Sequence, residues 1–155
     1  MAIRVYADTS VFGGLFDIEF AEASRRFFEL VAAHTLRLVT SSVVAREIDG
    51  APEQVRAAFR AGLGGAELLR VSDAAVRLAA GYIDAGILTA RSADDSLHVA
   101  LATVGRCDLI VSWNFRDIVR FDKIRLYNEV NGRFGFDPIA IHSPHEVIRI
   151  NDQDV

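Results

Sequence analysis

Short apolar runs alternate with longer amphipathic stretches along the whole chain. The runs are bounded by polar or glycine-rich segments, which is typical of buried strands. They predict strands at Ile3–Ala7, Leu36–Val39, Leu68–Val71, Leu109–Ser112 and Ile139–Ile141. Apolar residues at helical spacing in between predict helices over Ala21–His34, 53–61, 73–84, Ala93–Val104 and Ile124–Val130.

Polar caps and glycines set the ends of two helices that matter for the chemistry below. We expect Ser41 or Ser42 to cap a helix that carries Glu47 near its end, and Ser92 to cap Ala93–Val104. Mostly apolar strands, which alternate with helices, indicate a parallel sheet covered on both faces. The sequence therefore predicts an α/β fold, a three-layer α/β/α sandwich with a mostly parallel sheet.

The length and composition fit one globular domain over residues 1–155. Of these 155 residues, 51% are hydrophobic and 25% are charged, which is enough for a sizeable core. The single cysteine, Cys107, excludes an internal disulfide and is expected to be a core thiol. Charged residues interrupt every apolar run, and no secretory signal is recognisable, so we expect a cytoplasmic protein with no membrane contact.

The net charge of −4 is unusual for a nucleic-acid-binding domain, which is commonly basic. A cluster of acids at a metal site would account for this negative net charge, provided that the basic residues lie together elsewhere. Arginine is suited to bidentate phosphate contacts, although an arginine-rich composition also follows from a GC-rich genome. The basic residues of the C-terminal third are Arg106, Arg116, Arg120, Lys123, Arg125 and Arg133.

Acidic and amide side chains stand at positions from which they can reach one edge of the sheet. Asp8 follows the first predicted strand, and Asn114 and Asp117 follow the fourth. Glu47 and Asp95 lie near the ends of helices that flank this edge. Ligand sites of open parallel sheets form where the carboxyl ends of the strands meet. Clustered carboxylates need a neutralising cation, and Mg²⁺ prefers oxygen ligands, so the pattern predicts a divalent-cation site, and an ion placed there on a phosphodiester would promote its hydrolysis.

Each of these residues also has a simpler interpretation when it is taken alone. Asp8 is a typical helix-capping residue after a strand, and Asp95 favours the helix dipole in a first turn. Glu47 and Asp117 are common surface residues of a helix and a loop. His98 stands one turn after Asp95 and can orient a ligand, but a half-buried helix histidine is the simpler interpretation. The other histidines are too scattered to predict a zinc site.

Four segments together resemble the PIN-domain nucleases, specifically the VapC-like toxins of bacterial type II toxin–antitoxin pairs. The resemblance covers essentially the whole chain. Its segments are Asp8–Gly14, Ser42–Ile48, Asp95–Ala102 and Val111–Phe115.

This resemblance implies an endoribonuclease that depends on Mg²⁺ or Mn²⁺. Asp8, Glu47 and Asp95 fall on three acidic positions of the family and are the expected ligands of the metal, and Ser10 falls on the hydroxyl residue that orients the first acid. The family commonly has an aspartate where this chain has Asn114, and an amide is a poorer ligand for a hard cation. Asp117, three residues further on, is the candidate to supply the missing charge.

The resemblance also implies partners: an RNA substrate, a second copy of the chain in a homodimer, and a cognate antitoxin protein. Two alternatives stay open at this point. The chain could be a non-catalytic PIN-like module that binds RNA or protein, or an RNA-processing nuclease that has no antitoxin. A haloacid-dehalogenase phosphatase is disfavoured because it needs a second aspartate where Ser10 stands, and a receiver domain is disfavoured because Lys123 lies too far past Ser112.

Overall fold

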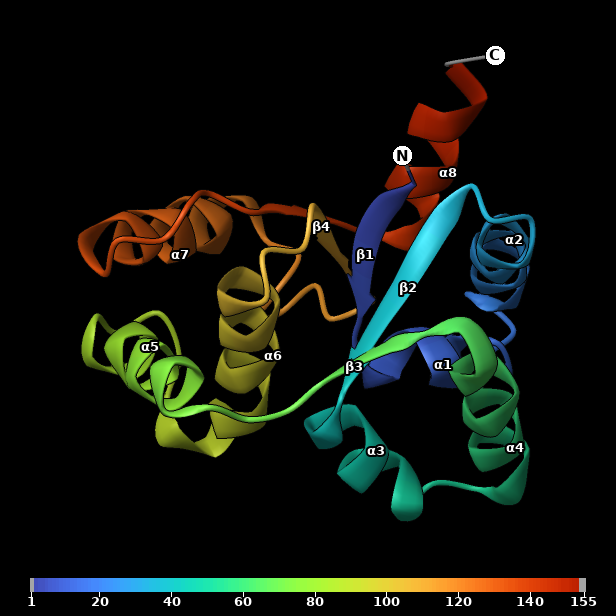
Figure 1. Cartoon of the computed structure of the whole chain (residues 1–155), viewed down its shortest axis with the longest axis horizontal. Coiled ribbons are helices and arrows are strands. Elements are labelled where there is room, and N and C mark those ends of the chain that lie inside the picture. Colours follow the sequence, from blue (N-terminus) through green and yellow to red (C-terminus); the bar gives the residue numbers. More distant parts are fainter. Residues whose placement is uncertain (1, 154–155) are drawn as a thin grey trace.

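A parallel sheet forms the centre of the fold (Figure 1). The computed structural model describes residues 2–153, and within them the sheet has five strands, each parallel to its neighbours. The strand order is β3-β2-β1-β4-β5, which places β1 in the middle. The strands are β1 (Ile3–Ala7), β2 (Leu36–Ser41), β3 (Glu67–Leu69), β4 (Leu109–Val111) and β5 (Ala140–His142).

Helices flank the sheet on both sides, which confirms the predicted α/β fold. In Figure 1, α1, α2 and α4 lie to one side of β1 and β2, whereas α5, α6 and α7 lie to the other. None of the helices within residues 2–153 is both long and apolar enough to cross a membrane. The helices are α1 (Thr9–Gly14), α2 (Ala21–Ala32), α3 (Ser42–Asp49), α4 (Glu53–Gly62), α5 (Asp73–Asp84), α6 (Ala93–Val104), α7 (Phe121–Arg133) and α8 (Pro144–Gln153).

The central strands are apolar along most of their length because helices cover both of their faces. Val5, Tyr6 and Ala7 of β1 have no exposed surface, and Leu38 and Val39 of β2 are buried beside them. The pairing register sets Tyr6 opposite Val39, which leaves the two strands level at their carboxyl ends. The first residues after the buried stretches of β1 and β2 therefore lie at the same edge of the sheet.

Several predicted boundaries shift once the chain is folded. The third strand lies at Glu67–Leu69 rather than Leu68–Val71, because Glu67 pairs in register with Val39. Helix α7 is longer at both ends than the predicted Ile124–Val130. Strand β5 begins one residue later than expected and lies at the sheet edge, as predicted.

The C-terminal helix α8 was missed by the sequence analysis. Its start carries a reciprocal cap: the backbone N–H of Glu146 donates to Ser143 Oγ at 3.3 Å, and the Ser143 N–H donates to Glu146 Oε1 at 3.0 Å. Pro144 then occupies the first helical position, where its missing N–H costs nothing. This serine-to-glutamate spacing is a recognisable signature of a helix start, so the sequence did contain the signal.

The two predicted serine caps have different outcomes. Ser41 caps α3, since its Oγ accepts the backbone N–H of Val44 at 3.2 Å. Ser92 is the N-cap residue of α6, as predicted, but its side chain makes no cap hydrogen bond. A short 3-10 turn, Ala90–Ser92, precedes that helix, and the Ser92 hydroxyl instead lies 3.4 Å from Oδ2 of Asp117. Long-range contact with the loop after β4 takes the hydroxyl away from the helix end.

Candidate metal-dependent nuclease site

Asp8 is the innermost acid of the predicted site. It follows β1 directly, is buried, and its backbone N–H donates to the carbonyl of Val111 at 3.3 Å. One carboxylate oxygen accepts a hydrogen bond from Ser10 Oγ at 2.6 Å and the other from Ser112 Oγ at 2.7 Å. Two hydroxyls therefore fix the orientation of this carboxylate, one from the first turn of α1 and one from the residue that follows β4.

The same two serines tie the loop after β4 to the start of α1. The Trp113 N–H donates to Ser10 Oγ and the Asn114 N–H donates to Ser112 Oγ, both at 2.9 Å. Ser10 therefore has the orienting place that the resemblance implied for it. Ser112 donates one hydrogen bond to Asp8, as Ser10 does, although it was not among the predicted site residues.

Glu47 is held by a second network that starts inside the core. Its Oε1 lies 2.8 Å from Thr9 Oγ1 and 2.6 Å from Nε2 of His98. The other ring nitrogen of His98 lies 2.7 Å from the hydroxyl of Tyr6, and that hydroxyl lies 2.7 Å from Oγ of Ser41. Because a carboxylate only accepts, Nε2 must carry the proton that bonds to Glu47.

His98 is therefore not the half-buried helix histidine of the simpler interpretation. Its side chain is 1% exposed and both ring nitrogens have partners. Burial on its own would lower the pKa of His98, but the hydrogen bond to Glu47 and the charges of Asp8, Glu47 and Asp95 outweigh it and raise that pKa. In turn, burial would raise the pKa of Glu47, but His98 and Thr9 more than compensate and lower it.

Asp95 completes the group of acids at this edge. It stands in the first turn of α6 and is partly buried. Burial raises the pKa of Asp95, and the negative charges of Asp8, Asp117 and Glu47 raise it further, against the opposing charge of His98. Burial likewise raises the pKa of Asp8, despite the hydrogen bonds from Ser10 and Ser112. The structure therefore brings the four predicted acids close enough to interact.

Asn114 and Asp117 are both engaged in contacts of their own. The Asn114 Oδ1 accepts the backbone N–H groups of Arg116 and Asp117, at 3.2 and 3.0 Å, and so caps the turn that follows. The carboxylate of Asp117 lies 2.8 Å from Lys123 Nζ and 3.2 Å from Arg116 Nε. Burial opposes ionisation of Asp117, but these cations lower its pKa overall. Its negative charge is thus already paired within the protein.

The donor set suits a hard divalent cation, because carboxylate oxygens dominate it and it contains no thiolate. Within residues 2–153, no three His, Cys, Asp or Glu side chains converge closely enough to hold an ion by themselves. Mg²⁺ normally uses one or two carboxylates and keeps waters or phosphate oxygens in its remaining positions. Asp8 and Asp95 carry the raised pKa values that a neighbouring cation would relieve, so they fit such a site best.

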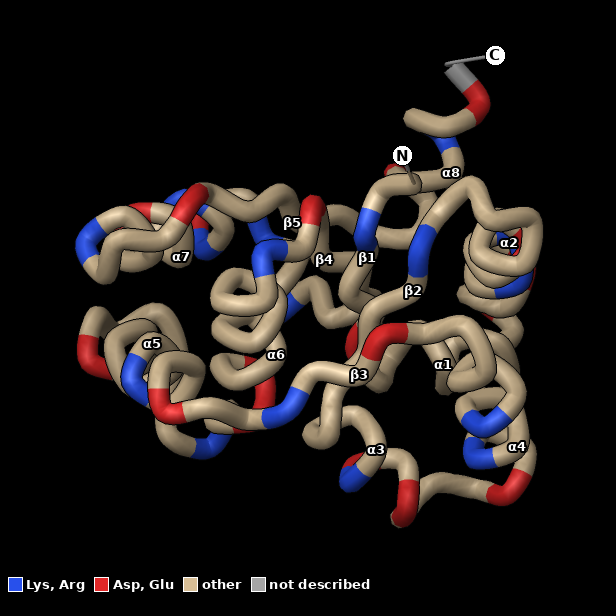
Figure 2. The backbone as a smooth tube through the Cα atoms, in the orientation of Figure 1, with Lys and Arg blue, Asp and Glu red and all other residues tan. Residues whose placement is uncertain are grey.

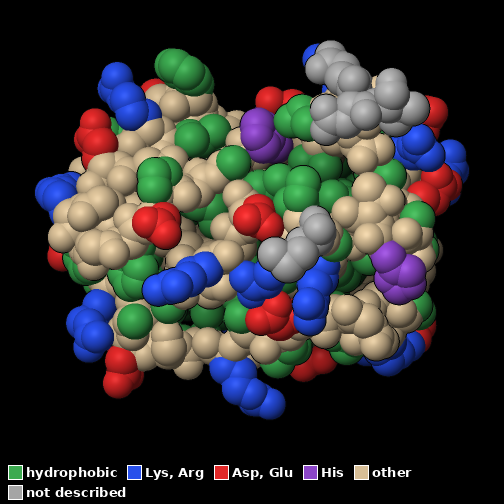
Figure 3. Space-filling view, turned by 45° about the horizontal axis from the view of Figure 1, so that its top comes forward, with side chains coloured by type: hydrophobic (Ala, Val, Ile, Leu, Met, Phe, Trp, Pro, Cys, Tyr) green, Lys and Arg blue, Asp and Glu red, His purple; other side chains and the backbone are tan. Residues whose placement is uncertain are grey.

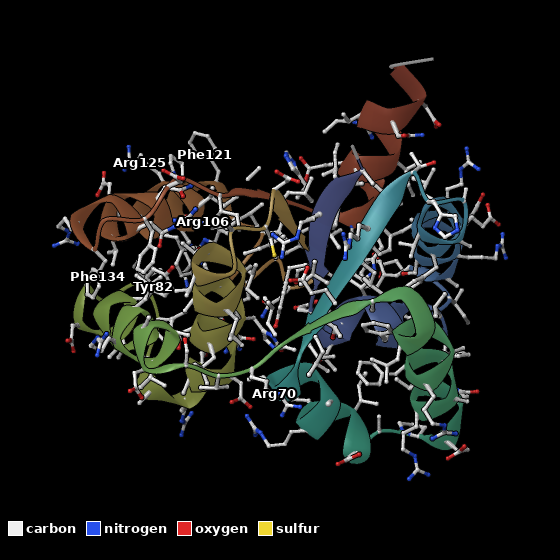
Figure 4. All side chains as sticks on the ribbon, viewed as in Figure 1. Arg70, Tyr82, Arg106, Phe121, Arg125 and Phe134 are labelled. Carbon is white, nitrogen blue, oxygen red and sulfur yellow. The ribbon has the colours of Figure 1, made fainter. Side chains whose placement is uncertain are left out.

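Half of the predicted basic residues of the C-terminal third are engaged in ion pairs within residues 2–153. Arg116 and Lys123 pair with Asp117, and Arg120 pairs with Asp122. Figure 4 shows Arg106 and Arg125 in the neighbourhood of α7 and the upper end of α6. Blue and red segments alternate along the backbone in Figure 2, and basic and acidic side chains are interspersed on the face shown in Figure 3. Arginines therefore serve local ion pairs as much as any common surface.

No protein-family model matches the chain, and no curated protein matches it either. Solved structures do. A chain in the crystal structure of VapBC2 from Rickettsia felis bound to a DNA fragment from their promoter matches with a TM-score of 0.60, at 13% identity, over 91% of this chain and 98% of that chain. Mycobacterium tuberculosis VapC20, a sarcin-ricin loop cleaving toxin, matches with a TM-score of 0.52, at 14% identity, over 88% of this chain and 98% of its own. The protein therefore has the fold of the VapC toxins, as the resemblance in its sequence predicted.

Proposed function

We propose that the protein is an endoribonuclease that hydrolyses RNA phosphodiester bonds with Mg²⁺ or Mn²⁺. The observation that carries this proposal is the buried Asp8, held by two serine hydroxyls and surrounded by the charges of Glu47 and Asp95. Acids whose pKa values are perturbed by burial and by one another cluster at functional sites. The likeness in fold to a toxin that cleaves the sarcin-ricin loop supports RNA as the substrate.

The side chains have distinct parts in this chemistry. Asp8 and Asp95 would hold the cation, and Ser10 and Ser112 keep Asp8 in one orientation. His98 and Thr9 hold the Glu47 carboxylate in one orientation through their contacts with its Oε1. The other oxygen, Oε2, remains available to the site. The chemistry that a divalent cation supplies when bound is charge neutralisation of the phosphate and a lower pKa of the attacking water. That water forms the new bond to phosphorus as the bond to the leaving oxygen breaks, without a covalent protein intermediate.

We further propose that the protein is the toxin of a toxin–antitoxin pair and acts as a cytoplasmic homodimer. The likeness to a chain of VapBC2 supports an antitoxin as partner. A gene for a small antitoxin-like protein immediately upstream would support this role over RNA processing without an antitoxin. Light scattering of the purified protein measures whether it is a dimer.

The decisive experiment is cleavage of RNA by protein that is free of any partner. We expect cleavage with Mn²⁺ or Mg²⁺, none in EDTA, and a loss of at least about 100-fold in Asp8→Asn, since the cation contributes several kcal/mol to the reaction. Cleavage that survives both EDTA and Asp8→Asn contradicts the metal mechanism. RNA binding without turnover in any metal would favour the non-catalytic module instead.

A further inference from the structure

An exposed aromatic ring stands in the loop that follows β4, whose first residue is hydrogen-bonded to Asp8, and it has no part in the mechanism above. Phe115 is 49% exposed, although it is a large apolar side chain. It stands in the loop after β4, one residue after Asn114 and two before Asp117. The hydrogen bonds of Ser112 to Asp8 and of the Asn114 N–H to Ser112 fix the start of this loop against the innermost acid.

Two other aromatic side chains pack against the Phe115 ring. Its centroid lies 6.1 Å from that of Trp113 in an edge-to-face arrangement and 6.5 Å from that of Phe20. Trp113 and Phe20 stack on each other at 4.1 Å, and the Trp113 indole N–H donates to Ser24 Oγ at 2.9 Å. Trp113 itself is buried. Phe115 is therefore the outermost member of an ordered aromatic group, with half of its surface open.

The backbone that carries Phe115 is equally well fixed. The carbonyl of Asn114 accepts the N–H groups of Ile118 and Val119, at 3.2 and 2.8 Å, and Ile118 is fully buried. With the Asn114 side chain capping the same turn, the loop is held at both ends. A ring that is already ordered loses little conformational entropy when a flat ligand packs on it.

The charges next to Phe115 indicate what kind of flat ligand would suit it. Arg116, the following residue, has a side chain that is 82% exposed, and it pairs with Asp117 through Nε. Its terminal guanidinium nitrogens remain able to donate to phosphate. An aromatic face beside a guanidinium, at the rim of a phosphodiester-cleaving site, matches the way proteins bind unpaired bases of single-stranded RNA.

We propose that Phe115 is a stacking platform for an unpaired base of the RNA substrate, close to the bond that is cut. This inference rests on the proposed nuclease function and adds to it a residue that contacts a base of the substrate. Arg116 contacts the phosphate next to the stacked base. The acids determine which phosphodiester bond is cut. The Phe115 ring favours an RNA strand in which a base is not stacked on its neighbours.

The test measures binding rather than cleavage, so that it is independent of turnover. In the Asp8→Asn background with Mg²⁺, a single-stranded oligoadenylate of about 12 nucleotides is compared with an RNA duplex of the same length. Trp113 is the only tryptophan in the chain and lies against Phe115, so its fluorescence reports the stacking directly. We expect the single strand to bind and to quench Trp113, and the duplex to bind more weakly.

Four variants separate base stacking from nonspecific apolar binding. Phe115→Ala should weaken single-strand binding about 5- to 150-fold and remove the quenching, whereas Phe115→Trp should keep the affinity. Phe121→Ala is the matched control, because Phe121 is 89% exposed and projects from the start of α7 in Figure 4. Ile18→Ser is the second control, since Ile18 is exposed on the loop that leads to Phe20 but has no ring. Neither control should change the affinity.

The outcomes distinguish the inference from the function on which it rests. Unchanged binding in Phe115→Ala, or no binding of the single strand at all, overturns the stacking role even if the wild type cleaves RNA. Unchanged RNA affinity together with a changed mass by light scattering assigns Phe115 to a protein interface, which also overturns it. Ring-dependent binding by a wild-type protein that cuts nothing supports the platform and rejects the nuclease.

Discussion

Nε2 of His98 lies 2.6 Å from Oε1 of Glu47, a contact that joins the second turn of α6 to the end of α3. Tyr6, from the central strand, holds the opposite side of the imidazole ring. The orientation of an acid at the surface of the site is therefore set by a chain of hydrogen bonds that begins in the core. His98 acts on the reaction only through Glu47, as a positioning residue.

Replacing His98 should weaken the site without removing any acid. We expect His98→Gln to lower Mn²⁺ affinity and cleavage about 10- to 100-fold, as is usual for a residue that orients an acid around a bound metal. Calorimetric titration of the protein with Mn²⁺ measures this effect apart from activity. His34→Asn is the control, because His34 is exposed and has a φ of 61° that asparagine tolerates. Equal Mn²⁺ affinity in both variants would contradict the positioning role.

The stability of the metal-free protein should depend on pH through the same pair. The pKa of His98 is raised in the folded state, so its contribution is complete below the unfolded value of about 6.5 and is lost as the pH rises through the folded value. The pKa of Glu47 is lowered, so its contribution is present above about 4.5 and is lost as the pH falls through the folded value.

Urea unfolding of wild type and His98→Gln across this range checks the sign. The difference in unfolding free energy between the two proteins should shrink on the alkaline side of about 6.5. A difference that grows with rising pH would mean that His98 is buried in its neutral form.

Asp95 should cost stability when no metal is present. Burial and the charges of Asp8, Asp117 and Glu47 raise its pKa, so its ionised form is unfavourable in the fold. We expect Asp95→Asn to stabilise metal-free protein by about 1 kcal/mol, or about 2–4 °C in Tm, while abolishing cleavage. Mg²⁺ should raise the Tm of wild type and not that of the variant. A variant that melts earlier than metal-free wild type would show that Asp95 has a structural partner.

The aromatic group behind Asp8 depends on Gly14. A Cβ at this position would lie 2.6 Å from Ser24 Oγ and 2.7 Å from the Trp113 indole nitrogen, which is too close for either to stay in place. We expect Gly14→Ala to destabilise the protein by about 1–3 kcal/mol, read as a lower urea midpoint. Gly13→Ala is the matched control, because nothing lies within 4 Å of its added Cβ. It should be neutral or slightly stabilising.

Asp117 should matter for stability more than for metal binding. Its carboxylate pairs with Lys123, and both side chains are largely buried. Asp117→Asn leaves this ammonium without its partner, at a cost of about 3 kcal/mol, whereas Asp122→Asn breaks only an exposed pair with Arg120 and should cost less than about 1 kcal/mol. A loss of Mn²⁺ affinity in Asp117→Asn at unchanged stability would instead identify Asp117 as a metal ligand.

The sequence by itself determined the five strands, most of the helices between them and the edge at which the acids meet. Alternation of apolar runs with amphipathic helices favours a parallel sheet, which buries both kinds of element. An acid placed directly after a buried strand, such as Asp8, then has to emerge at the carboxyl edge. Both the parallel sheet and the position of Asp8 follow from the order of apolar and polar residues along the chain, which is visible in the sequence.

Only the tertiary structure decided which side chains hold those acids. Tyr6 has the pattern of an ordinary core residue, and its hydroxyl finds Ser41 and His98 because of the β1–β2 register and the packing of α6. Asn114 and Asp117 looked like free ligands, but a turn and a lysine engage them. Hydrogen-bond partners distant in sequence follow from distances set by the whole fold, and no spacing along the chain encodes them.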